Sequence, residues 1–185
     1  MKPEPSVPSV PAIHPILAMP PAPLDLCVIA GTQRAAAPFL EWHIRQAAKL
    51  CDSPLRELTV IVASDGLIRR LHQQFFNDPT LTDVITFPLE QDQRGRALSG
   101  EIYICPSVAR RQAKLRHISI RHEMLLYTIH GILHLCGHDD LSARKCNAMH
   151  NEEDRILEKL GLGPVFGRPE LGTRRKPRLI PSQNR

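Results

Sequence analysis

The stretch from Glu123 to Asp140, EMLLYTIHGILHLCGHDD, decides how the chain is organised, because it combines a helical pattern with side chains that bind metals. His130 and His134 stand four residues apart, and residues at this spacing share one face of a helix. Two imidazoles placed in this way can hold one metal ion. The stretch therefore predicts a helix that carries two ligands of a metal site.

A third ligand has to come from beyond this helix. If the helix continued, His138 would lie about 12 Å of helical rise from His130, whereas Zn–N bonds measure only about 2.1 Å. Gly137 stands where a helix that ends in the left-handed conformation favours glycine. We therefore expect the chain to turn back at Gly137 and to deliver a later side chain. Spacing favours Asp140, and His138 is the alternative.

The predicted helix has one polar stripe on an otherwise apolar surface. At 100° per residue, Glu123 and Tyr127 fall on the same narrow face as the two histidines. A nearly buried helix is expected, and buried histidines need partners. Two ordinary core histidines would also fit an H-x3-H pair, but the glycine, the following acids and the polar stripe favour a metal.

Two histidines and one carboxylate leave the fourth position of zinc open, which is the catalytic pattern. Hydrolysis is the expected reaction class, with His130 and His134 acting through the metal-bound water. Zinc peptidases of the HExxH type carry a glutamate directly after the first histidine as general base. Gly131 occupies that position, which disfavours a peptidase. Glu123 lies about two turns away and is better placed to orient a ligand.

The length, net charge and cysteine content of the chain indicate what kind of protein carries this site. Its 185 residues indicate one domain with tails, and the net charge of +5 points to an anionic partner. Its five cysteines lack CxxC spacing and are expected to be buried free thiols in a reducing compartment. No membrane span or secretion signal is recognised, so a cytoplasmic protein is expected.

Residues 1–23 form a proline-rich tail expected to be disordered, and residues 162–185 form a basic tail. Residues 24–161 form the predicted catalytic domain. Within it Asp65 and Ser119 are expected to cap helices, and Trp42 is expected in the core. Strands are predicted at 24–30, 55–63, 83–87 and 101–105, a loop at 91–99, and further helices at 38–50, 66–75, 106–115 and 142–160.

Three stretches resemble one protein family. The run HGILHLCGHDD, from His130 to Asp140, is similar to the H-G-x-L-H-L-x-G-Y-D-H signature of the YbeY family, metal-dependent endoribonucleases also called rRNA maturation factors. The runs LTDVITFP (81–88) and GEIYI (100–104) resemble the family stretches P-T-D-V-L-S-F-P and G-D-I-x-I.

The resemblance implies an α+β fold, with a small mixed four-stranded sheet packed with about five helices and a metal site in a cleft at the end of one helix. It implies one Zn²⁺ per chain, held by His130, His134 and Asp140. The implied function is cleavage of single-stranded RNA in 16S rRNA 3′-end maturation and ribosome quality control, with the small ribosomal subunit and its assembly factors as partners. The alternative is a ribosome-assembly RNA-binding factor with a structural metal.

Two positions depart from the family pattern. The third ligand is normally histidine, whereas here it is Asp140, unless His138 binds the metal from the place usually held by tyrosine. Many members also carry an arginine, proposed to meet substrate phosphate, where this chain has Phe76. Arg69, Arg70 or the 110–116 helix would then have to supply the cation.

Overall fold

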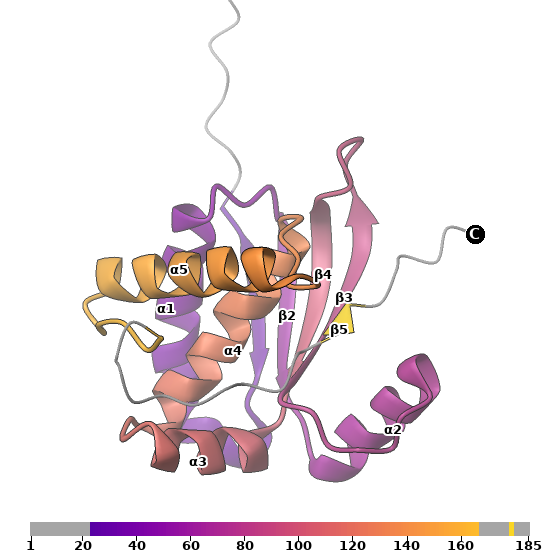
Figure 1. Cartoon of the computed structure of the whole chain (residues 1–185), viewed down its shortest axis with the longest axis vertical. Helices are drawn as coiled ribbons and strands as arrows, with labels where there is room; N and C mark the ends of the chain where they lie inside the picture. Colours follow the sequence, from indigo (N-terminus) through magenta and orange to yellow (C-terminus); the bar gives the residue numbers. More distant parts are fainter. Residues whose placement is uncertain (1–22, 167–177, 180–185) are drawn as a thin grey trace, which may run out of the picture.

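The computed structural model describes residues 23–166 and 178–179 of the chain. A five-stranded mixed sheet has the order β1-β2-β4-β3-β5 (Figure 1). Strands β1, β2 and β4 are parallel, β3 runs antiparallel to β4, and β5 pairs with β3 in parallel. The strands are β1 (Asp25–Ile29), β2 (Glu57–Val62), β3 (Val84–Gln91), β4 (Ala97–Ile104) and β5 (Arg178–Leu179).

The observed strands and helices together confirm the predicted α+β class. The four predicted strands are present, and β5 adds two residues from the region that the sequence suggested was a basic tail. The helices are the short 3-10 helix η1 (Gly31–Ala36), α1 (Ala37–Leu50), α2 (Asp65–Phe76), α3 (Pro106–Leu115), α4 (Ile120–Leu135) and α5 (Ala143–Lys159).

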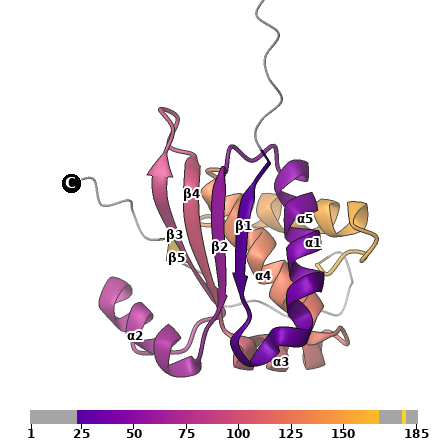
Figure 2. The same cartoon turned by 180° about the vertical axis from the view of Figure 1, so that it is seen from behind.

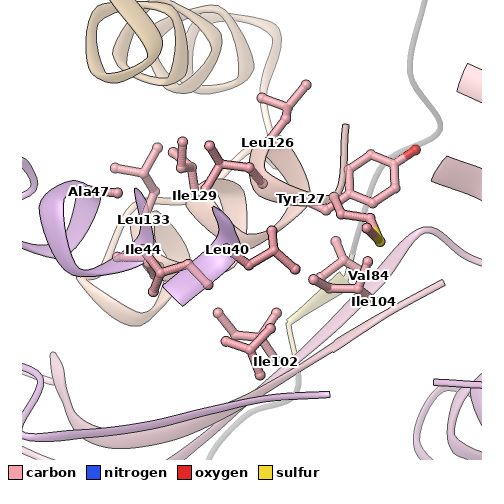
Figure 3. Packing of buried hydrophobic residues seen from close by; sticks show 14 of the residues in the cluster. Leu40, Ile44, Ala47, Val84, Ile102, Ile104, Leu126, Tyr127, Ile129 and Leu133 are labelled. Atoms are coloured by element: carbon pink, nitrogen blue, oxygen red, sulfur yellow. The ribbon is translucent and has the colours of Figure 1, made fainter. Parts of the chain in front are cut away.

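Alternate residues of the strands form two separate cores, because successive side chains of a strand point to opposite faces. Ile102 and Ile104 belong to the larger core with α1, α4 and α5, whereas Tyr103 and Ile85 belong to a smaller core with α2. Figure 2 shows α2 standing apart from the other helices. In the larger core, side chains of α1 and α4 pack against one another above Ile102 (Figure 3).

Helix α4 is the centre of the larger core, and every residue from Glu123 to Leu135 is buried, as the sequence predicted. The helix lies close against the sheet at Gly131. A Cβ at this position would lie 2.8 Å from Ile102 Cδ1 and 2.9 Å from Thr86 Oγ1. A larger residue here would force the Ile102 and Thr86 side chains to shift, since real Cβ atoms do not approach other atoms this closely.

Capping residues set where the helices begin. Ser119 accepts a hydrogen bond from the backbone N–H of His122, which confirms it as the cap of α4. Helix α2 starts one residue earlier than predicted, and its cap is Ser64, which accepts from the N–H of Leu67. The prediction of Asp65 as the cap was wrong, because its carboxylate lies inside the first turn and accepts from the Ser107 hydroxyl instead.

Three further predictions need correction. Trp42 is 56% exposed, because it lies on the outer face of α1 and not toward the sheet. The predicted loop 91–99 is shorter, since β3 extends to Gln91 and β4 begins at Ala97. All five cysteines are free, as predicted, but only Cys105 is buried. All but the last residue of the predicted proline-rich tail (1–23) and most of the predicted basic tail (162–185) lie outside the described residues.

Candidate metal centre

Helix α4 places the two histidines as their spacing predicted. The Nε2 atoms of His130 and His134 lie 3.0 Å apart, and both rings are almost fully buried. Asp140, which is 5% exposed, completes a group whose ligand atoms all lie within 4.8 Å of one another. These are the three residues that the sequence singled out as candidate ligands.

The turn after α4 brings Asp140 back to the histidines. Gly137 has a φ of +96°, the left-handed conformation that glycine adopts without strain. The N–H of His138 donates to the Leu133 carbonyl at 3.0 Å, and the N–H of Gly137 donates to the His134 carbonyl at 2.9 Å. This pair of bonds is a Schellman motif, which ends the helix and reverses the chain.

The side chain of His138, the alternative third ligand, lies outside the candidate metal site. Its side chain is exposed and is not part of the three-residue group. Its backbone carbonyl accepts a hydrogen bond from His134 Nδ1 at 2.9 Å. His138 therefore orients a neighbouring ring through its main chain.

The structure also shows a residue that the sequence analysis missed. Glu153, on α5, is fully buried, and its carboxylate lies 2.5 Å from His130 Nδ1 (the two helices are adjacent in Figure 1). A carboxylate that accepts from the outer nitrogen of an imidazole fixes the ring and raises its basicity as a ligand. The only sequence signal was an acidic residue at a helix position otherwise occupied by core residues.

Glu123 does not orient a ligand, contrary to expectation. It is fully buried two turns before His130, and Arg116 donates to its Oε1 at 2.5 Å. This buried ion pair connects the end of α3 to the start of α4. The position of Glu123 on the polar stripe was predicted correctly, but its partner, Arg116, directly follows α3.

The donor set fits a cation. A carbonyl oxygen only accepts, so His134 Nδ1 must carry the hydrogen, and the Nε2 of the neutral ring then has its lone pair directed inward. The Glu153 carboxylate favours the same tautomer in His130. Two lone pairs and the Asp140 carboxylate therefore converge on one point, an arrangement that a metal ion stabilises.

Burial favours the neutral form of His134. It lowers the pKa of His134, and this effect outweighs the hydrogen bond to the His138 carbonyl and the nearby charge of Asp140, which raise the pKa. A neutral imidazole is the form that binds metals.

Where many family members carry an arginine, this chain has a residue that packs in an apolar core. Phe76 is partly buried in the smaller apolar core, with its ring centroid 5.3 Å from that of His72. Two of the cations suggested as substitutes have other partners, since Arg69 donates to the Pro79 carbonyl and Arg116 is paired with Glu123.

A family model described as "Endoribonuclease YbeY" matches residues 32–161, a region that holds the candidate metal centre and helices α1 to α5. The chain belongs to the YbeY family. The resemblance predicted from the three sequence motifs is confirmed.

Curated relatives agree with the family model. The protein named "Endoribonuclease YbeY" from Kineococcus radiotolerans is 37% identical over 123 residues, which cover 63% of this chain and 70% of that protein. Its namesake from Protochlamydia amoebophila is 34% identical over 118 residues, 63% of this chain and 76% of the relative.

A solved structure supports the fold. The solution structure of TM1509 from Thermotoga maritima matches with a TM-score of 0.51 and 25% identity, over 82% of this chain and 99% of that one. Among the helices that the structure describes, none has the length and apolar character needed to cross a bilayer.

Proposed function

We propose that this chain is a zinc-dependent endoribonuclease that cleaves single-stranded RNA in 16S rRNA 3′-end maturation and ribosome quality control. Family membership makes it an endoribonuclease that processes RNA. The observation that carries the proposal is the convergence of His130, His134 and Asp140 on one point at the end of α4. Three protein ligands leave the fourth position of a tetrahedral zinc ion free for chemistry, with one ion per chain.

Each residue of the centre has a separate task. His130 and His134 present their Nε2 atoms, and Asp140 adds a carboxylate oxygen. Glu153 and the His138 carbonyl hold the two rings in place, so that the site is formed before substrate arrives. A zinc ion bound there would acidify water for attack and polarise a phosphoryl oxygen.

The packing of α4 explains why the peptidase pattern is absent. A glutamate at position 131 would have to grow from a point within 3 Å of the Ile102 and Thr86 side chains. The packing at this position therefore disfavours the glutamate of the HExxH pattern and argues against a zinc peptidase.

The remaining parts of the proposal concern partners and location. A ribonuclease that matures rRNA would meet single-stranded rRNA, the small ribosomal subunit and its assembly factors, and would act in the cytoplasm. The excess of basic residues, +5 overall, suits an anionic partner.

Metal content tests the ligand assignment. Wild-type protein and the variants Asp140→Ala and His138→Ala would be analysed by mass spectrometry after zinc loading. We expect Asp140→Ala to lose the zinc and His138→Ala to keep it, because the side chain of His138 is outside the group. The reverse result would make His138 the third ligand.

Cleavage assays separate the enzyme from its alternative, a ribosome-assembly RNA-binding factor with a structural metal. Zinc-loaded wild type and His134→Ala would be incubated with single-stranded RNA and with the matching duplex. We expect the wild type alone to cut, and only the single strand. Equal cleavage by both proteins would indicate a contaminating nuclease and leave the binding factor as the better explanation.

A further inference from the structure

Two cations, the half-buried Arg96 and the exposed Lys145, lie against the turn that carries the proposed metal ligand, and each is held by a carboxylate. Arg96 lies at the start of the turn, beside Gly137, and Lys145 lies beside Asp139, the residue directly before Asp140. Gly137 and Asp139 are two peptide units apart, so their Cα atoms are separated by at most about 7 Å. The two cations therefore flank one short segment of the metal centre.

Arg96 comes from the turn between β3 and β4. Its Cγ lies 3.8 Å from the position of a Cβ on Gly137. Its Nε and Nη2 both donate to the Asp92 carboxylate at 2.9 Å, and Asp92 also accepts from the backbone N–H groups of Arg94 and Arg96. The acid that closes the hairpin thus also fixes the direction of the guanidinium.

Lys145 comes from the first turn of α5. Its Nζ donates to Asp139 Oδ2 at 2.5 Å, while half of its side chain stays exposed. Asp139 in turn accepts from the N–H of Leu141, so the carboxylate is part of the turn. Figure 1 shows the start of α5 close to the end of α4, beside β4.

Both cations keep donors for a ligand. Arginine has five N–H donors and lysine three, and among the described residues each side chain hydrogen-bonds to one carboxylate only. Planar guanidinium groups and ammonium groups are the usual partners of phosphate oxygens. An acid that pre-orients such a cation reduces the entropy lost when the phosphate binds.

We propose that Arg96 and Lys145 form a phosphate clamp, which holds the backbone of single-stranded RNA at the turn beside the metal centre. The clamp rests on the proposed function and names how that site grips its substrate. It also supplies the cationic contact that Phe76 cannot make. Because the clamp contacts phosphates and no bases, it contributes affinity without sequence preference.

The salt dependence of binding tests the clamp. Arg96→Gln and Lys145→Gln, singly and together, would be titrated by fluorescence anisotropy with single-stranded 2′-O-methyl RNA, which keeps the phosphates. Matched controls are Arg34→Gln, an exposed arginine of η1, and Lys159→Gln, about 21 Å further along α5. The slope of log K against log salt is negative, and we expect its magnitude to decrease by about 0.7 for each clamp cation removed. The decrease should be the same for every RNA sequence, and the slope should stay unchanged in the controls.

Conservative variants separate charge from structure. Arg96→Lys and Lys145→Arg keep the cation and should keep the slope, while zinc content and thermal unfolding should match the wild type in all variants. Slopes in the glutamine variants equal to those of the controls would overturn the clamp. Wild-type protein that binds the RNA analogue but leaves RNA uncut would refute the proposed function, and the slopes would still decide the clamp.

Discussion

Replacing Glu153 by glutamine tests whether the buried carboxylate on α5 tunes the metal centre. The amide keeps the size of the side chain but removes the charge that faces His130 Nδ1 at 2.5 Å. Loss of such a partner typically weakens metal affinity about 10- to 100-fold. This corresponds to a loss of about 1.4 to 2.7 kcal/mol of zinc-dependent stabilisation at a fixed, saturating zinc concentration.

This loss of stabilisation corresponds to a decrease in Tm. Each kcal/mol shifts the Tm of a protein of this size by about 2–4 °C, so the variant should lose about 3–11 °C of the zinc-induced rise in Tm. Thermal unfolding with and without zinc, together with a competitive titration against a chromophoric chelator, would measure both quantities.

Glu152→Gln is the matched control, since Glu152 precedes Glu153 on the same helix but pairs at the surface with Arg155 at 2.6 Å. A surface ion pair contributes about 0–1 kcal/mol, and its loss should leave the zinc affinity unchanged. If Glu153→Gln bound zinc as tightly as the wild type and this control, the carboxylate would not tune the ligand, and the reasoning for the orientation of His130 would fail.

Three further substitutions test the framework of the site by urea denaturation. Gly131→Ala should lower the free energy of unfolding by about 1–3 kcal/mol through overpacking against the sheet. Gly66→Ala is the control, because the space around its Cβ position is open, and it should be neutral or stabilising. Equal effects of the two substitutions would contradict the packing argument. Gly137→Ala should lower the free energy of unfolding by about 1–2 kcal/mol because of its positive φ. It should also weaken zinc binding, and an unchanged zinc affinity would show that the effect of the turn is purely local. Arg116→Ala should cost about 3–5 kcal/mol by leaving Glu123 buried without its partner, and a loss below 1 kcal/mol would show that the ion pair is dispensable.

The predictions that the structure bears out depend on short stretches of sequence. The helical period alone puts His130 and His134 on one face, and the left-handed preference of glycine places the turn at Gly137. Strand positions followed from apolar runs between turn residues. The predictions that failed concern which way a side chain faces, as with the exposed Trp42, because periodicity does not say which face of a helix meets the sheet.

The sequence by itself determined that a buried helix carries two imidazoles and ends at a glycine, since these features depend on residues within about two turns of each other. Only the tertiary structure decided which groups surround them. Glu153 reaches His130 from 23 positions further along the chain, and Arg96 reaches Gly137 from the turn between β3 and β4. Contacts between distant residues depend on how the helices and the sheet pack in three dimensions, and a local sequence pattern carries no information about that packing.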